Sequence, residues 1–287
     1  MSNDHKPGLT GKGTLYIVAT PIGNLEDISF RALKVLKGVH LIAAEDTRRT
    51  KKLLAAYQIP TRLTSLYEHN ELKKSGALIA AILAGSDIAY VSDAGTPGIS
   101  DPGYLLIQEA LAHDITIVPI PGACAAIAAL SVSGLPTDSF AFHGFLPAKP
   151  GKRRHFIKSL EKETKTMVFY ESPHRLAPTL HDLLAILGDR QAVVTRELTK
   201  IYEEATRGRL SEIIETWQGR DVKGEITLVL AGNTEPEERP SEADVRVLLK
   251  RYKVSPGLSE RDLIEKISRE LGLPRKMVYQ VVMQAKE

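Results

Sequence analysis

A glycine-rich loop in the first half of the chain has the composition of a ligand-binding loop. Residues 92–103 read Ser-Asp-Ala-Gly-Thr-Pro-Gly-Ile-Ser-Asp-Pro-Gly, between the apolar run 88–91 and the helical pattern 104–111. Backbone N–H groups in such a loop can face a bound group, and Asp93 and Asp101 can accept hydrogen bonds from hydroxyl or ammonium donors. Ordinary turns use the same residue types. Because strand-to-helix connections usually run two to about six residues and this one is about twice as long, we favour a binding role.

Five other apolar runs also end in polar or glycine-containing segments, which are residues 20–25, 45–50, 119–122, 171–175 and 196–200. In the first half of the chain the apolar runs alternate with helical patterns, which indicates a parallel α/β sheet. The carboxyl ends of parallel strands meet at one edge of the sheet, where open α/β domains bind their ligands. We therefore expect the loops 20–25, 92–103 and 119–122 to lie together.

The order of the patterns predicts an α/β protein of two domains with a small all-α extension. We expect a disordered tail at 1–13, an N-terminal α/β domain at 14–134, an α+β domain at 135–233 with partly antiparallel strands, a linker at 234–240 and helices in 241–287. Gly272 and Pro274 separate the last two helical patterns, which is compatible with a helix-turn-helix. This segment has ten Lys and Arg against seven Asp and Glu. A helical cap or dimer contact and nucleic-acid docking both remain open.

Composition indicates an ordinary globular protein of 287 residues, with 43% hydrophobic and 25% charged residues. The net charge of +3 permits a nucleic-acid partner without requiring one. The chain has a single cysteine, Cys124, which excludes an internal disulfide framework and fits a reducing cytosol. We interpret Cys124 as a small buried residue. Because residues 1–13 lack an apolar core and no apolar run approaches about 18 residues, we expect a cytoplasmic protein with no membrane partner.

Several common chemistries lack their sequence motifs here. No Gly-x-Gly-x-x-Gly follows the first apolar run, and neither a phosphate-binding Gly-x-x-x-x-Gly-Lys nor a Gly-x-Ser-x-Gly nucleophile motif is present. The eight histidines show no metal-ligand spacing, so we expect no metal site.

The motifs that remain occur in a distinctive order. They are Thr20-Pro21-Ile22-Gly23-Asn24-Leu25, Ala44-Glu45-Asp46-Thr47-Arg48, Ser92 to Pro97 with Asp101-Pro102-Gly103, Pro121-Gly122, Phe145-Leu146-Pro147, Phe169 to Arg175, and Arg196 to Lys200. From about residue 14 to 232 this set resembles the tetrapyrrole (corrin/porphyrin) methylase family. Metabolic members carry a Gly-Asp-Pro loop where this chain has Ser92 to Pro97, which favours the branch that methylates rRNA.

The resemblance implies a two-domain class III methyltransferase fold that binds S-adenosylmethionine between its domains, usually as a homodimer. It implies methyl transfer to the ribose 2'-hydroxyl of one cytidine in 16S rRNA of the small ribosomal subunit. The residues that it places beside the cofactor are Pro21, Gly23, Asp93, Ala94, Gly95, Thr96, Pro121 and Gly122 from the first domain and Tyr170 and Gly232 from the second.

A ribose hydroxyl is a weak nucleophile near pH 7, so a general base could add roughly 10²- to 10⁴-fold to the rate. The candidate catalytic residues lie where apolar runs end, and they are Glu45, Asp46, Glu171, Arg196, Glu197 and Lys200. Lys200 would need a lowered pKa to act as a base. The alternative for the segments Glu45 to Arg48 and Glu171 to Arg175 is a structural ion pair.

RNA contacts are expected from basic residues that could hold phosphates, which are Arg48, Lys149, Lys152, Arg153, Arg154 and Arg175, with Arg196 as a further candidate. The segment 147–165 has seven Lys and Arg against two Glu, and a solvated helix face accounts for that charge as well as RNA contact does. A looped-out base would need a stacking group, for which Tyr67, Phe145 and Tyr170 remain open. A small-molecule methylase of the same family and a non-catalytic binding module are the alternative functions.

Overall fold

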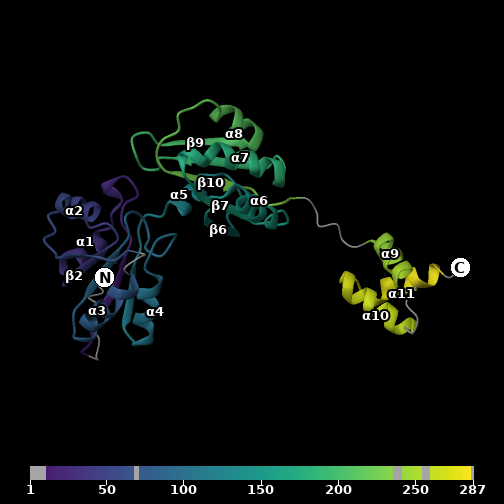
Figure 1. Ribbon diagram of the computed structural model, residues 1–287, viewed down its shortest axis with the longest axis horizontal. Helices are drawn as coiled ribbons and strands as arrows, with labels where there is room; N and C mark the ends of the chain where they lie inside the picture. The colour runs from purple at the N-terminus through teal and green to yellow at the C-terminus, as the bar shows by residue number, and fades with distance from the viewer. Residues whose placement is uncertain (1–10, 68–70, 235–240, 254–258, 286–287) are drawn as a thin grey trace. The chain divides into compact units, whose positions relative to one another are not determined.

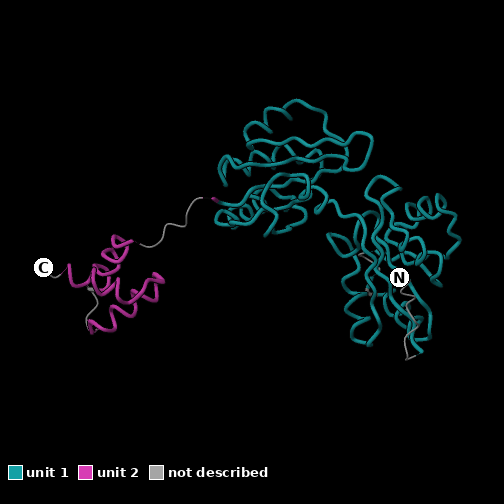
Figure 2. Tube along the Cα trace, turned by 180° about the vertical axis from the view of Figure 1, so that it is seen from behind, with its two compact units in different colours: residues 1–233 teal, residues 234–287 magenta. Residues whose placement is uncertain are grey.

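The computed structural model describes residues 11–67, 71–234, 241–253 and 259–285 and divides into two compact units, residues 1–233 and 234–287 (Figures 1 and 2). Residues 1–10 of the predicted tail and 235–240 of the predicted linker lie outside the described residues. Within the described ranges, no helix combines the length and apolar character needed to cross a bilayer.

The first sheet has five parallel strands in the order β3-β2-β4-β1-β5, as the alternation of patterns predicts. The strands are β1 (Thr14–Val18), β2 (Leu41–Ala44), β3 (Leu63–Ser65), β4 (Ile88–Val91) and β5 (Thr116–Ile120). All four residues of β4 are buried, because helices cover both faces of a parallel sheet.

Two pairs of helices sandwich this sheet (Figure 1). One face packs against α1 (Phe30–Gly38) and α2 (Thr47–Ala56), through a cluster that includes Leu36 and Leu54. The other face packs against α3 (Glu71–Leu83) and α4 (Tyr104–Ala112), through Ile82 and Leu106. A short 3₁₀ helix (Leu25–Asp27) follows β1.

The second sheet is mixed, in the order β6-β7-β10-β8-β9. Its strands are β6 (Phe140–Phe145), β7 (Thr166–Glu171), β8 (Gln191–Arg196), β9 (Glu204–Arg209) and β10 (Ile226–Leu230). The β6–β7 pair is parallel and the other pairs are antiparallel, in agreement with the partly antiparallel arrangement that we predict.

The helices of this half lie on opposite faces of the second sheet. One face packs against α6 (Pro150–Ser159), α7 (Pro173–Leu187) and α8 (Leu210–Trp217). The other face is covered by α5 (Ala125–Ser131), through Ala126, Ala129 and Leu130 against Val168, Val193 and Val229. Although α5 directly follows β5 of the first sheet, it packs on the second sheet, so the start of α5 lies where the two halves meet.

The C-terminal unit contains α9 (Glu242–Lys253), α10 (Glu260–Leu271) and α11 (Arg275–Gln284), close to the three predicted helical patterns. Val245, Ile267 and Val278 contribute one buried side chain from each helix to a shared apolar cluster. Ser259 caps α10, and Gly272 ends that helix in the left-handed conformation, φ 62°, that glycine adopts readily.

Candidate active site

Three loops at the carboxyl edge of the first sheet are joined by hydrogen bonds. Thr20, after β1, exchanges two backbone hydrogen bonds with Gly95, after β4, with N···O distances of 2.8 and 3.0 Å. The Thr96 hydroxyl donates to the carbonyl of Ala123, after β5, at 3.2 Å. Gly95 has φ +82°, a conformation strained for residues with a Cβ. These loops therefore lie together, as the order of the strands predicts.

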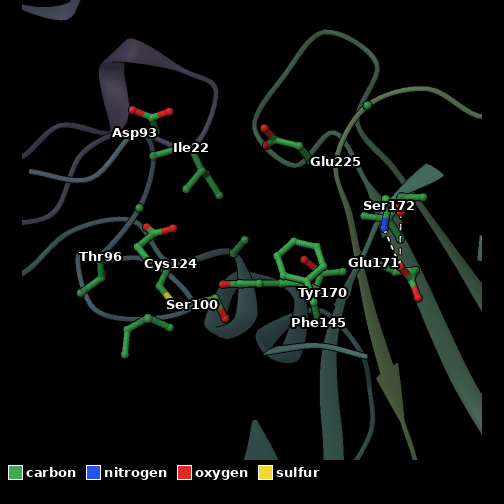
Figure 3. Close-up of a pocket in the computed structure, with 18 of the residues that line it drawn as sticks. Ile22, Asp93, Thr96, Ser100, Cys124, Phe145, Tyr170, Glu171, Ser172 and Glu225 are labelled. Carbon is green, nitrogen blue, oxygen red and sulfur yellow. Dashed lines mark hydrogen bonds between the residues drawn. The ribbon is translucent and has the colours of Figure 1, made fainter. Parts of the chain in front are cut away.

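A cavity of about 390 Å³ opens between these loops and the second sheet (Figure 3). Ile22, Asp93 and Thr96 face it from one side, and Phe145, Tyr170 and Glu225 face it from the other. Its lining consists of Ile22, Glu45, Arg49, residues 93–96, residues 99–101, Cys124, Ala125, Phe145, residues 170–173 and residues 224–227. The volume lies in the range of about 300–1,000 Å³ that is typical of small-molecule sites.

A second cavity, of about 290 Å³, adjoins the first and shares Ile22, Arg49, Asp93, Ala94 and Glu225 with it. Its remaining lining comes from Thr20, Pro21, Gly23 and Leu25 after β1, from Thr50, Lys52 and Leu53 of α2, and from Ser92 and Lys200. The hydroxyl of Thr20 is buried and has no hydrogen-bond partner among the described residues. A polar atom is therefore available in the wall of this cavity.

Carboxylates give the larger cavity an unusual electrostatic character. Burial, together with the charges of Asp101 and Asp93, raises the pKa of Glu45, although the Asp93 N–H donates to Glu45 Oε2 at 3.2 Å. Burial and the charge of Asp93 also raise the pKa of Asp101, against the effect of a hydrogen bond from Ser92. Two carboxyl groups with raised pKa in one cavity are suited to accept protons or to hold cations.

Comparison with known proteins identifies the family. A sequence model described as Tetrapyrrole (Corrin/Porphyrin) Methylases matches residues 14–214. The chain belongs to this family. It is 47% identical over 276 residues to a protein of Halalkalibacterium halodurans named ribosomal RNA small subunit methyltransferase I, covering 95% of this chain and 96% of the relative. A Synechocystis protein of the same name is 47% identical over 275 residues, covering 95% of this chain and 98% of the relative.

A solved structure confirms the fold of this tetrapyrrole methylase. The crystal structure of uroporphyrin-III C-methyltransferase from Thermus thermophilus, complexed with S-adenyl homocysteine, superposes with a TM-score of 0.54 at 18% identity. The match covers 76% of this chain and 97% of that chain. The predicted two-domain class III methyltransferase architecture is therefore correct.

Asp46, a predicted catalytic residue, caps α2 and does not line the larger cavity. Its Oδ1 accepts the backbone N–H of Arg48 at 2.8 Å, and the Arg48 guanidinium donates to both carboxylate oxygens. The hydrogen bonds from Arg48 lower the pKa of Asp46 to about 2. This pairing argues against Asp46 as a proton acceptor. Arg48, a predicted RNA contact, pairs with Asp46, but its side chain is 87% exposed.

Glu171 and Arg175 form the structural ion pair that the sequence left open. The Glu171 side chain is fully buried and accepts hydrogen bonds from Ser172 N at 2.8 Å and Thr179 Oγ1 at 2.6 Å. Arg175 Nε lies 3.3 Å from Glu171 Oε1, and its Nη2 donates to the carbonyls of Leu146 and Pro147. Internal partners occupy both side chains, which argues against the predicted roles in proton transfer and phosphate binding.

Lys200 is held as a cation. Its Nζ lies 2.7 Å from Glu197 Oε1 and 3.2 Å from Glu225 Oε2. Burial acts to lower the pKa of Lys200, but the hydrogen bonds and charges of Glu197 and Glu225 outweigh burial and raise it. A lysine base needs the opposite shift, so the structure argues against that role.

Arg196, also a predicted catalytic residue, pairs with Glu204 at 3.1 Å and donates to the carbonyl of Lys223. Arg220 binds the same Glu204 carboxylate at 2.8 Å. Arg196 therefore belongs to an ion-pair network of the second sheet and does not line the larger cavity.

The predicted cofactor residues divide into three groups. Asp93, Ala94, Gly95, Thr96 and Tyr170 line the larger cavity, and Pro21 and Gly23 line the adjoining one.

Pro121, Gly122 and Gly232 line neither cavity. Pro121 and Gly122 precede Cys124, and a Cβ at Gly122 would lie 2.9 Å from the Cβ of Ala19. Gly232 packs against the Thr164 carbonyl beyond the end of β10, about 20 Å along the strand from the cavity at Ile226. Close backbone packing accounts for both glycines.

The predicted RNA-binding helix, α6, has one buried arginine. Arg153 is only 4% exposed, and its Nε donates a hydrogen bond to Asp182 at 2.8 Å. Its charge is therefore paired within the protein and does not face a phosphate of RNA. Lys149, Lys152 and Arg154 are exposed. The exposed side of this segment keeps its basic character.

Three further residues, Arg49, Cys124 and Glu225, line the larger cavity although no sequence motif predicted them there. Arg49 lies in the first turn of α2, with its guanidinium 3.4 Å from the Asp93 carboxylate. Cys124 is half-buried because α5 begins where the halves meet. Glu225 precedes β10 and carries no motif, so no sequence signal marked it.

Proposed function

We propose that this protein transfers a methyl group from S-adenosylmethionine to the ribose 2'-hydroxyl of a cytidine in 16S rRNA of the small ribosomal subunit. The observation that carries the proposal is 47% identity, over nearly the full length of both chains, to proteins named ribosomal RNA small subunit methyltransferase I. The carboxylate-lined cavity between the two halves is the site that we assign to this reaction.

The residues of the two cavities fit the cofactor chemically. S-adenosylmethionine, when bound, supplies an electrophilic methyl group on a sulfonium cation. Apolar walls at Ile22 and Ile226 suit its uncharged parts, and the Asp93 and Asp101 carboxylates suit its cationic groups. The Thr20 hydroxyl, which has no hydrogen-bond partner in the described part of the chain, and the loop backbone around Gly95 provide further polar atoms.

We assign the general base to Glu45. Its carboxylate lines the cavity. Its pKa is raised toward pH 7, which makes the carboxylate a stronger proton acceptor. In this role Glu45 would accept the proton of the ribose hydroxyl as the ribose oxygen bonds to the methyl carbon and the bond from that carbon to the sulfonium sulfur breaks, with S-adenosylhomocysteine as the leaving group. The loops must also hold that oxygen in line with the methyl group, which accounts for much of the expected rate.

A small-molecule substrate is the principal alternative. The match to the uroporphyrin-III methyltransferase covers 76% of this chain, whereas the matches to the two relatives named for rRNA each cover 95%. About a quarter of this chain has no counterpart in the tetrapyrrole enzyme, and a small substrate does not require that extra surface. The basic exposed side of α6 also favours a polyanionic partner.

A methylation assay tests the proposal. The protein is incubated with tritiated S-adenosylmethionine and with small ribosomal subunits from a strain that lacks it, and the position of the label in the rRNA is then mapped with nucleases. We expect label on a single cytidine ribose. Tight cofactor binding without label on subunits or naked rRNA would contradict the rRNA assignment and favour a small-molecule substrate.

We place the reaction in the cytoplasm with its ribosomal substrate. The homodimer remains a prediction that sedimentation equilibrium can test.

A further inference from the structure

A bulge in β6 brings two aromatic side chains to one face of the second sheet. The β6–β7 register shifts between Phe142, which pairs with Val168, and Gly144, which pairs with Phe169. In a regular strand Phe142 and Phe145, three residues apart, would face opposite sides of the sheet. With the extra residue, both rings contact Tyr170 edge-on, with centroid distances of 5.0 and 5.6 Å.

The bulge is also where a loop of the first sheet touches the second. Gly144 has φ +61°, and a Cβ there would lie 2.8 Å from the Ser100 hydroxyl oxygen, so a larger residue would push the loop 92–103 away. His143, the extra residue, stacks on Phe169 in the opposite core with centroids 5.2 Å apart. The bulge therefore fixes Phe145 against the cavity, as bulges near active sites commonly re-aim a side chain.

Phe145 is both a cavity residue and a strongly exposed aromatic. It lines the larger cavity, and 56% of its surface is exposed although it is fully apolar (Figure 3). Tyr170 lies behind it, and burial raises the pKa of the Tyr170 hydroxyl well above its ordinary value. Tyr67 is 43% exposed but does not line the cavity. Of these three aromatic residues, only Phe145 both lines the cavity and has a largely exposed ring.

We propose that Phe145 is the stacking platform for the base of the methylated nucleotide, which makes it a substrate-positioning residue. This inference rests on the proposed rRNA function. A ribose whose hydroxyl enters the cavity brings its attached base to the cavity wall, and an unpaired base stacks readily on an aromatic ring. Stacking is tolerant of base identity, so Phe145 holds the nucleotide, and other groups select cytosine.

Four variants test the stacking role: Phe145→Ala, Phe145→Leu, Phe145→Trp and, as a matched control, Phe140→Ala. Phe140 is a 39% exposed aromatic at the other end of β6, and it does not line the cavity. Phe145→Ala and Phe145→Leu should raise the KM for small subunits about 5- to 100-fold, because leucine keeps apolar volume but offers no ring. Phe145→Trp should have a KM for small subunits close to the wild-type value, and so should Phe140→Ala.

Calorimetric titration with S-adenosylmethionine separates substrate contact from cofactor contact. We expect the Kd for the cofactor to stay the same in all four variants. A weakened cofactor Kd with an unchanged KM for subunits would overturn the proposal and assign Phe145 to the cofactor. Normal kinetics in Phe145→Leu would also overturn it. Failure of the wild-type protein to label subunits would instead contradict the proposed function, and with it this inference.

Discussion

The Nζ of Lys200 lies 2.7 Å from the Oε1 of Glu197, and the same oxygen accepts the backbone N–H of Glu225 at 2.9 Å. Burial acts to raise the pKa of Glu197, but these hydrogen bonds and the charge of Lys200 outweigh it and lower the pKa. Across the adjoining cavity, Asn24 N–H donates to Thr199 Oγ1 at 3.1 Å. The turn 197–200 therefore links the second sheet to the loop after β1.

We expect Glu197→Gln to lower the free energy of unfolding by about 1 kcal/mol at pH 7, allowing for partial solvent screening. A carboxylate with a lowered folded-state pKa contributes stability that is present above its unfolded pKa and is lost as the pH falls through the folded pKa. Wild-type protein should therefore lose more stability than the variant between pH 7 and pH 3. Urea denaturation at both pH values measures the difference, and equal losses would contradict the assigned pairing.

Glu45→Gln should lower kcat about 100-fold or more while leaving the Kd for S-adenosylmethionine within a few fold, because the proton acceptor is lost and the cavity shape is kept. The raised pKa of Glu45 gives a second expectation. Since the base must be deprotonated, wild-type kcat should begin to fall at a higher pH than an ordinary glutamate would cause. A kcat profile from pH 5 to pH 9 measures this limb.

Asp46→Asn is the matched control for Glu45→Gln. Asparagine can still cap α2, and Asp46 does not line the larger cavity, so kcat should stay within a few fold of wild type. A large loss in Asp46→Asn with none in Glu45→Gln would reverse the assignment. A loss in Asp101→Asn alone would move the proton acceptor to Asp101, the other cavity carboxyl group with a raised pKa.

The sequence could predict which loops meet, because the order of parallel strands determines their shared edge. Thr20, Gly95 and Thr96 lie as expected for this reason. The sequence could not tell a carboxylate that is available for proton transfer from one that structural contacts hold, and both kinds line the larger cavity. Glu45 and Glu171 both follow apolar runs, but hydrogen bonds from Thr179 and the charge of Arg175, both on α7, saturate Glu171.

Residues that act through packing between distant segments were also invisible in the sequence. Glu225 reaches the site because β10 pairs with β7 and β8, an arrangement that no local motif encodes. The bulge at Gly144 reverses the face of Phe145, so alternation along the strand would have assigned that side chain to the wrong side. Gly232 lines neither cavity, and in the sequence a glycine needed for close packing against Thr164 looks the same as a glycine needed for a ligand.

Glu171→Gln should destabilise the fold by about 3 kcal/mol, because a fully buried carboxylate partner of Arg175 is replaced by a neutral group. The folded fraction should keep most of its kcat, since the Glu171 oxygens already have partners within the protein. Urea denaturation, with activity normalised to folded protein, separates the two effects. Unchanged stability with a large loss of kcat would instead return Glu171 to the catalytic residues.

Arg153 and Arg154 are neighbours on α6 with opposite environments, so they separate folding from RNA binding. Arg153 pairs with Asp182 at 2.7 Å with its side chain 5% exposed, whereas the Arg154 side chain is 59% exposed. Arg153→Ala should cost about 3 kcal/mol of stability and leave the salt dependence of RNA binding unchanged. Arg154→Ala should keep stability within about 0.5 kcal/mol and reduce the slope of log K against log salt by about 1, as expected for one lost phosphate contact. If the slope is the same in Arg154→Ala as in wild type, the basic surface of α6 is a solvated helix face and the RNA contacts lie elsewhere.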